Sequence, residues 1–436
     1  MPKKLTQRQA AILIAVVVIV IGGLALFVLN LRTGSSGGAS ANLTVWGTDS
    51  PKAFNDMISK YAGPGSGSQA SIKYTQIDPA NYGSQVLQAI AAGTGPDVFE
   101  IGNRDLPQWR SVLMPLHSAF ASTFNLSMLQ QDFPDVVSRD FVSGGYIYAL
   151  PLSIDTMAMI YNRDLFNTAG IVTPPKTWSQ LDADIALLRQ ENSSGQITQA
   201  AFALGGSEAS ISDAPDIVFL MMIQNGSQMI SSDGSSVTFA STGGASGTAG
   251  QNAFNFYLQF SNAASQYYTW NDSMGDALDA FAQGKVAAIF DYSSALPTIR
   301  AKAPFLNYGV APMPQADNAQ TAVAYADYRG LAVNKNSPNA AAAWQFIIGL
   351  TTNPTDASIY TSDTGAPPAL RSLISAGMTD PVMAVFASQA LEAKSWYEAN
   401  SVNIDTAVNA AITSVLQGSA DSTTALNEAQ SQINGG

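Results

Sequence analysis

The stretch that decides the fold is "ALPLSIDTMAMIYNRDLFNTAGIVTPPKTW", residues 149–178. Its apolar first half predicts a buried strand. The residues that follow predict a short helix and a second helix that begins after the two prolines, with Thr177 as its N-cap. One acid, Asp155, interrupts the apolar run. Because an unpaired buried carboxylate is costly, we expect Asp155 to be paired, to lie at an edge, or to be reserved for a ligand.

Length and composition narrow the class of protein. The 436 residues suffice for two domains of ordinary size, and 46% of them are hydrophobic while only 12% are charged. The net charge is −12 and no basic block follows the N-terminus, which argues against nucleic acid as a partner. The chain has no cysteine and a single histidine, His117. This excludes disulfides, thiolate or histidine-cluster metal sites and Cys nucleophiles, so we expect no metal and no cofactor.

The N-terminal segment predicts a membrane anchor. Residues 10–29 form an uninterrupted run of 20 nonpolar residues, which as a helix would span roughly 30 Å of hydrocarbon. We expect a cytoplasmic basic segment at 1–9, a transmembrane helix at 10–31 and a Gly/Ser linker at 32–41, with the rest of the chain extracytoplasmic. The alternative is a signal peptide cleaved near residues 39–41, but the length of the apolar run favours the anchor.

Beyond the linker, strand-like and helix-like segments alternate. The expected strands are 42–47, 70–77, 97–102, 156–161, 286–291, 307–313 and 329–334. Alternation with helices predicts βαβ units, a mainly parallel sheet and the α/β class. In a chain with two such lobes, a ligand is expected in the cleft between the sheets.

Four motifs together resemble a known family. They are "GTGPDVFEIGN" (93–103), "YALPLSIDTMAMIYNRDLF" (148–166), "AFAQGKVAAIFDYSS" (280–294) and "YRGLAVNKNSPNAAAAWQFI" (328–347). In order and spacing they are similar to the extracellular solute-binding proteins of ABC importers, family 1, of the maltose and maltodextrin type. The resemblance extends from about residue 42 to residue 433.

The resemblance implies a two-lobed, periplasmic-binding-protein-like fold of type II with two or three hinge crossovers. The expected lobes are lobe 1, residues 42–152 and 328–364, and lobe 2, residues 153–327 and 365–436. The expected crossovers lie near 152–154, 326–330 and 364–368. Ligand would bridge both lobes and shift an equilibrium between open and closed forms.

Candidate ligand contacts lie at strand ends that face the expected cleft. They are Trp46, Thr48, Asp49, Asn103, Arg104, Asp155, Asp213, Trp270, Asp291, Tyr292, Tyr325, Tyr328 and Arg329. Acids, amides and arginine suit sugar hydroxyls, and flat aromatic side chains suit the C–H faces of pyranose rings. In the family, the acid at the position of Asp155 accepts hydrogen bonds from sugar hydroxyls, and Asp213 falls near a second such acid. Asp155 could instead cap the hinge.

Two departures from the family pattern bear on the ligand. Ser293 and Ser294 stand where relatives often carry tryptophan, and Pro215 stands where maltodextrin binders have an aromatic residue. The pocket then stacks its ligand on another aromatic residue or binds something smaller than an oligosaccharide. A polyamine would suit the acids, whereas a phosphate would need more base than Arg104 and Arg329 supply.

We therefore expect a monomeric, membrane-anchored binding protein that captures a sugar-like ligand and delivers it to the permease subunits of an ABC importer. One alternative is an exported carbohydrate-active enzyme that uses paired carboxylates, for which Asp155, Asp213 and Asp291 could supply the acids. Another is a surface adhesin or scaffold, which needs no preformed cleft.

Overall fold

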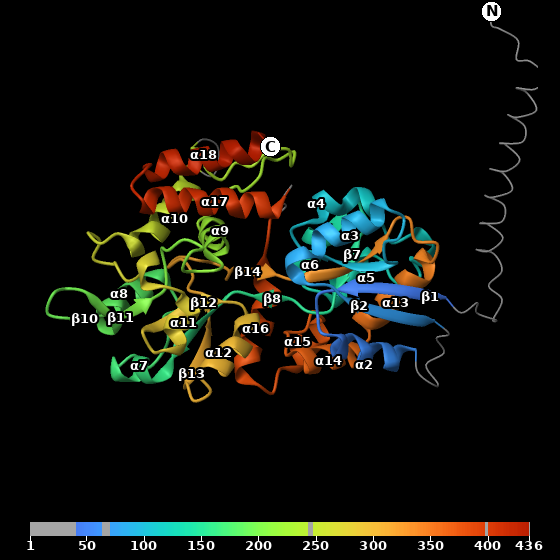
Figure 1. The fold of residues 1–436 in the computed structure, drawn as a ribbon, viewed down its shortest axis with the longest axis horizontal. Coiled ribbons are helices and arrows are strands. Elements are labelled where there is room, and N and C mark those ends of the chain that lie inside the picture. Colours follow the sequence, from blue (N-terminus) through green and yellow to red (C-terminus); the bar gives the residue numbers. More distant parts are fainter. Residues whose placement is uncertain (1–40, 63–69, 243–246, 397–399, 436) are drawn as a thin grey trace, which may run out of the picture.

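The computed structural model describes residues 41–62, 70–242, 247–396 and 400–435. Two α/β lobes lie side by side, the first on the right and the second on the left of Figure 1. Within these described ranges, no helix is both long enough and apolar enough to cross a membrane. The membrane segment expected at 10–31 lies outside them.

A six-stranded sheet forms the centre of the first lobe, in the order β2-β1-β3-β15-β4 with β7 paired to β15. Its strands are β1 (Asn42–Gly47), β2 (Ser71–Gln76), β3 (Val98–Gly102), β4 (Leu113–Met114), β7 (Ala149–Pro151) and β15 (Arg329–Asn334). A hairpin of β5 (Val142–Ser143) and β6 (Tyr146–Ile147) accompanies it. The helices of this lobe are α2 (Pro51–Tyr61), α3 (Tyr82–Ala91), α4 (Leu106–Trp109), α5 (Leu126–Asp132), α6 (Asp135–Phe141), α13 (Ala340–Thr352), α14 (Pro354–Thr364) and α15 (Arg371–Ala376).

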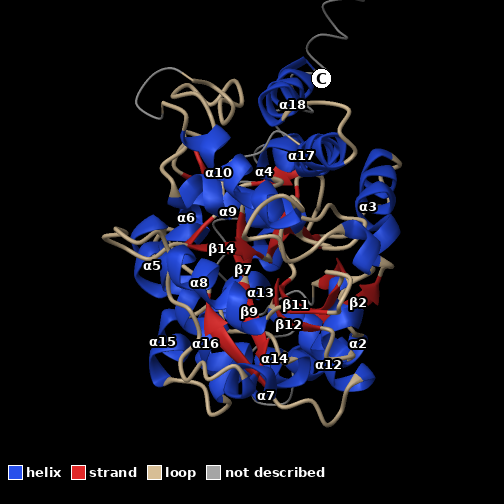
Figure 2. Cartoon of the chain, turned by 90° about the vertical axis from the view of Figure 1, so that its left-hand side faces the viewer, coloured by secondary structure: helices blue, strands red, loops and turns tan. Residues whose placement is uncertain are grey.

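A five-stranded sheet in the order β10-β11-β12-β9-β13 forms the centre of the second lobe. Its strands are β9 (Ala158–Asn162), β10 (Gln190–Glu191), β11 (Ile197–Phe202), β12 (Val286–Asp291) and β13 (Tyr308–Pro312). Its helices are α7 (Arg163–Thr168), α8 (Trp178–Leu188), α9 (Ala214–Gln224), α10 (Ala249–Leu258), α11 (Ala277–Ala282), α12 (Leu296–Lys302), α16 (Pro381–Gln389), α17 (Ser401–Leu416) and α18 (Ser422–Gly435). The last two helices pack together at one end of the molecule (Figures 1 and 2).

The expectation of mainly parallel sheets is wrong. In the two large sheets, β1–β2, β1–β3 and β11–β12 are parallel, whereas every other described pair is antiparallel. The cause is the connection between the lobes: β9 and β15 each follow a segment that crosses from the other lobe, and they enter their sheets against the direction of the neighbouring strands.

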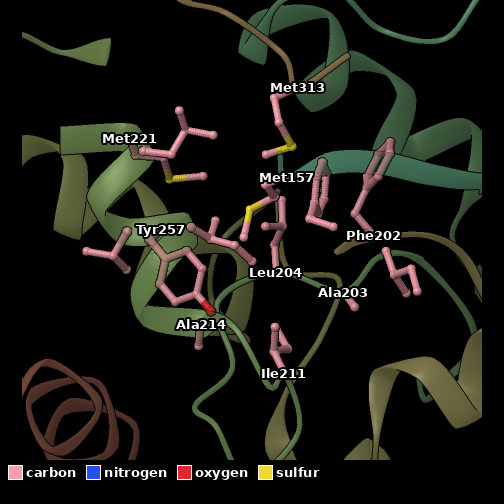
Figure 3. Packing of buried hydrophobic residues seen from close by; sticks show 14 of the residues in the cluster. Met157, Phe202, Ala203, Leu204, Ile211, Ala214, Met221, Tyr257 and Met313 are labelled. Atoms are coloured by element: carbon pink, nitrogen blue, oxygen red, sulfur yellow. The ribbon is translucent and has the colours of Figure 1, made fainter. Parts of the chain in front are cut away.

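Each lobe has its own hydrophobic core. Figure 3 shows part of the second core, in which Met157, Phe202 and Met313 lie close together. Ile154 belongs to the first core and Met157 to the second, so the chain crosses between the lobes at these residues. The chain returns to the first lobe in the next crossover segment, after Tyr325, which still belongs to the second core. Trp178, the first residue of α8, packs in the second core, and only 8% of it is exposed.

The crossover segments pair with one another. They are β8 (Asp155–Thr156), β14 (Ala324–Asp327) and β16 (Ala393–Lys394). Strand β14 pairs antiparallel with β8 and parallel with β16, which makes a three-stranded ribbon between the lobes. We call it the hinge ribbon. Strands β8 and β14 lie at or next to the crossovers expected near 152–154 and 326–330, whereas the crossover expected near 364–368 is not part of the ribbon and β16 was not expected.

The lobe boundary expected at residue 365 does not agree with the cores. Ala369, Leu370 and Ile374 pack in the first core because α15 lies against α5 and α14. Later, Ala393 is again part of the first core, and Trp396 is part of the second. The chain therefore passes between the lobes more often than two or three times.

Candidate ligand-binding cleft

A cavity of about 210 Å³ lies between the lobes beside the hinge ribbon. Six of the residues proposed from the sequence line it, namely Thr48, Asp49, Asp155, Tyr292, Tyr328 and Arg329. Two more lining residues were noted in the sequence, Asp327 at the return crossover and Ser294 where relatives often carry tryptophan. The lining residues that the sequence did not single out are Glu100, Leu152, Ser153, Leu331, Tyr360 and Ala366. The cavity thus draws side chains from both lobes and from the hinge ribbon.

The first-lobe wall is held by the loop that follows β1. The backbone N–H and Oγ1 of Thr48 donate to Glu100 Oε2 at 3.0 and 3.2 Å. The Tyr360 hydroxyl on α14 donates to Asp49 Oδ2 at 2.6 Å, and the Tyr74 hydroxyl donates to the Asp49 carbonyl at 2.8 Å. These contacts fix the positions of two carboxyl groups at the cavity.

Glu100 is an acid inside a strand, and only 5% of it is exposed. Burial, reinforced by the nearby charge of Asp49, raises its pKa to about 7, although the Arg329 guanidinium opposes this shift. Its second oxygen, Oε1, accepts no hydrogen bond from the described residues. Glu100 therefore presents to the cavity a carboxyl oxygen that is available to a ligand.

Asp155 lies in the hinge ribbon and is tied to the second lobe. Its carboxylate accepts from the backbone N–H of Thr156 (2.9 Å), from the N–H and Oγ of Ser293 (3.1 and 2.7 Å), and from the N–H of Ser294 (3.2 Å). Burial raises its pKa to about 7. The acid in the apolar run is thus paired with neutral donors and caps the turn after β12, although it also lines the cavity.

Two tyrosines complete the walls. The Tyr292 hydroxyl donates to Asp216 Oδ2 at 2.6 Å, and the Tyr328 hydroxyl donates to Asp140 Oδ2 at 2.7 Å. Both tyrosines are nearly fully buried, so their positions are set by the surrounding structure. They border the cavity, but each side chain is packed in the core of its own lobe.

Arg104, a proposed contact, instead bridges the lobes. It follows β3 of the first lobe, and its guanidinium pairs with Asp405 at 2.9 Å and with Asp216 at 3.4 Å, both in the second lobe. The neighbouring Asn103 donates from Nδ2 to Asp140 Oδ2 and to the Ala326 carbonyl, each at 3.2 Å. Neither side chain lines the cavity, because both are engaged by protein groups.

Asp213 and Asp291 line a smaller, separate cavity in the second lobe. They share a hydrogen bond, and burial together with the charge of Asp291 raises the pKa of Asp213 to about 9. The pair therefore holds a proton at neutral pH. The sequence had placed both acids in the cleft between the lobes, but the pair lies outside it.

The three remaining candidates are packing residues. Trp46 is half-buried against the first core, and Trp270 and Tyr325 are buried in the second. The Trp270 Nε1 donates to Ser210 Oγ at 3.1 Å. These aromatic side chains do not line the cleft, because the strands and loops that carry them turn them inward.

One signal in the sequence could have identified Glu100. It stands between Phe99 and Ile101 in an otherwise apolar strand, as Asp155 does in its own run. No local signal marks Tyr360, which reaches the cavity from a largely polar helix. Among the described residues, no group of three or more His, Cys, Asp or Glu is arranged to hold a metal ion.

The model of the bacterial extracellular solute-binding protein family matches residues 47–357, which is most of the chain. The chain belongs to this family. A binding protein of Brucella abortus (strain 2308) is 27% identical over 261 residues, a match that spans 59% of this solute-binding protein and 59% of its relative.

Solved structures share the architecture. The ABC substrate-binding protein from Listeria monocytogenes, in complex with cycloalternan, is 19% identical with a TM-score of 0.71, covering 91% of this chain and 99% of the other. The cyclic alpha-maltosyl-1,6-maltose binding protein from Arthrobacter globiformis is 18% identical with a TM-score of 0.74 and the same coverage. At these identities the likeness shows the two-lobed fold.

Proposed function

We propose that this protein captures a carbohydrate in the cavity between its lobes and delivers it to the permease of an ABC importer. The observation that carries this proposal is the cavity itself, which is lined from both lobes and from the hinge ribbon. A ligand held there contacts both lobes at once and therefore favours the closed arrangement. The family and the carbohydrates named with the two solved relatives support this class of ligand.

The chemistry of the cavity suits a hydroxylated ligand. Asp49 and Glu100 offer carboxyl oxygens, and Arg329 offers a planar donor group. Phosphorylated polyols are a different class of ligand. A phosphate would meet more carboxyl groups than basic groups in this cavity, so we expect no binding of glycerol phosphate.

We propose further that residues 10–31 anchor the protein in the membrane, with the lobes outside the cytoplasm. The support is the apolar run and the basic residues before it. The protein should then stay in the membrane fraction after carbonate extraction. Recovery of a soluble mature chain that begins near Asn42 would contradict the anchor and favour a cleaved signal.

The ligand proposal is tested by titration calorimetry of the full chain against mono- and oligosaccharides, polyols and glycerol phosphate. The variant Ala366→Trp places a bulky ring in the cavity and should abolish binding of the best saccharide. The matched control Ala183→Trp adds the same ring on the exposed face of α8 and should bind normally. Equal binding by Ala366→Trp and by the wild type would contradict a site in this cavity.

A further inference from the structure

We propose that the ligand of this cavity is a saccharide that carries a protonated amine. This inference rests on the proposed function, because it specifies the class of sugar that the same cavity takes. Four carboxyl groups line the cavity, those of Asp49, Glu100, Asp155 and Asp327, and Arg329 is its single lining cation among the described residues. A neutral sugar leaves that excess of acid in place, whereas an ammonium group offsets it.

Two of the acids are set opposite each other by the backbone. Asp155 and Asp327 are register partners in the antiparallel pair of β8 and β14. Directly opposed residues point to the same face of a sheet, and like charges in that arrangement are destabilising. The Asp327 carboxylate accepts no hydrogen bond and forms no ion pair with any described residue. A ligand cation beside Asp327 would meet an exposed carboxylate that no described protein group occupies.

Both nearby arginines already contact protein groups. The Arg329 guanidinium lies over the Tyr82 ring, 5.6 Å from its centroid. Arg104 is held by Asp216 and Asp405 across the lobes. Burial raises the pKa of Asp216 and of Asp405, and the negative charge of Asp327 adds to the rise in both.

The hydrogen-bonding groups fit an ammonium ion attached to a sugar ring. An ammonium group has three donors and no acceptor, which matches carboxyl oxygens such as Glu100 Oε1 and those of Asp327. The hydroxyls of the same sugar could use Thr48, Ser153 and Arg329. A linear polyamine would satisfy the acids but would leave these polar groups without matching partners.

The test is titration calorimetry of the full chain with two probes that differ in charge. One is the dimer of β-1,4-linked glucosamine with free amines, and the other is the same dimer with both amines acetylated. The free-amine dimer should bind about ten- to a hundredfold more tightly at pH 7, as hydrogen bonds to charged groups allow. That ratio should shrink as NaCl is raised, because salt screens charge interactions. Asp327→Asn should also shrink it, while the charge-matched control Glu428→Gln, on the exposed surface of α18, should not.

The possible results separate the two proposals. Equal or tighter binding of the acetylated dimer would overturn the amine inference and leave the carbohydrate proposal intact. Binding of spermidine with no binding of either dimer would overturn the amine-bearing sugar and the carbohydrate proposal together. Failure of both dimers and of every sugar in the wider panel would also contradict both.

Discussion

Asp155 and Asp327 lie directly opposite each other in an antiparallel strand pair. Asp155 lies where the chain first crosses between the lobes, and Asp327 lies where it crosses for the second time. Both carboxyl groups line the cavity, so its floor is made of the hinge itself. Under the proposed function, a ligand that contacts these two residues would touch the strand pair that links the lobes, so that binding and lobe closure would be coupled there.

Replacing Asp155 should lower stability even without ligand. Asp155→Ala leaves three backbone N–H groups and the Ser293 hydroxyl without their acceptor, which should cost about 1–3 kcal/mol in the free energy of unfolding. Chemical denaturation of the full chain measures this, with the exposed Glu428→Ala as control. Unchanged stability combined with lost ligand affinity would mean that Asp155 serves the ligand alone.

The buried acids predict that stability falls as pH rises. The pKa of Asp213 is raised to about 9 and that of Asp155 to about 7, against about 4 in an unfolded chain. A raised pKa means that the folded state holds the proton more tightly, so the contribution is fully present below about pH 4 and is lost as pH rises through the folded value. The melting temperature should thus fall between about pH 5 and pH 9, and Asp213→Asn should flatten the upper part of that slope. A melting temperature that rises with pH over this range would contradict the assignment.

The ion pairs of Arg104 should hold the lobes together. Arg104→Ala leaves Asp216 and Asp405 without their cation, and breaking a buried pair costs up to about 3–5 kcal/mol. We expect a lower melting temperature and a larger radius of gyration in small-angle scattering. Arg371→Ala is the matched control, because it breaks a pair with the exposed Asp135 inside the first lobe and should change neither quantity much. An unchanged radius of gyration for Arg104→Ala would contradict a bridging role.

Three expected strands, 42–47, 286–291 and 329–334, have the bounds of β1, β12 and β15. Strand β1 alternates exposed and buried residues, whereas β12 and β15 are buried over most of their length. The runs "VAAIFD" and "RGLAVN" form β12 and β15 with the expected bounds, because unbroken apolar runs between turn residues have few other ways to bury their side chains. Strand direction could not be predicted in the same way. It depends on which lobe the preceding segment comes from, and no local pattern records that.

The lining of the cavity was predicted only in part, for a similar reason. Thr48 and Arg329 line it as expected, because they end or begin strands at the edge of the cleft. Trp270 and Tyr325 are buried in the second core instead, because the sequence around an aromatic residue does not show whether its side chain faces a core or a cavity. Tyr360 was missed because its contact with Asp49 joins residues 311 positions apart.

The most direct test of the account is hydrogen–deuterium exchange of the full chain with and without the best saccharide from the panel. If the sugar binds in the interlobe cavity, protection should appear together at residues 47–49, 292–294 and 327–331, which belong to the first lobe, the second lobe and the hinge ribbon with the strand after it. The remote helix α18 should exchange as before. Protection confined to one lobe, or absent from all three segments while the sugar is bound, would contradict it.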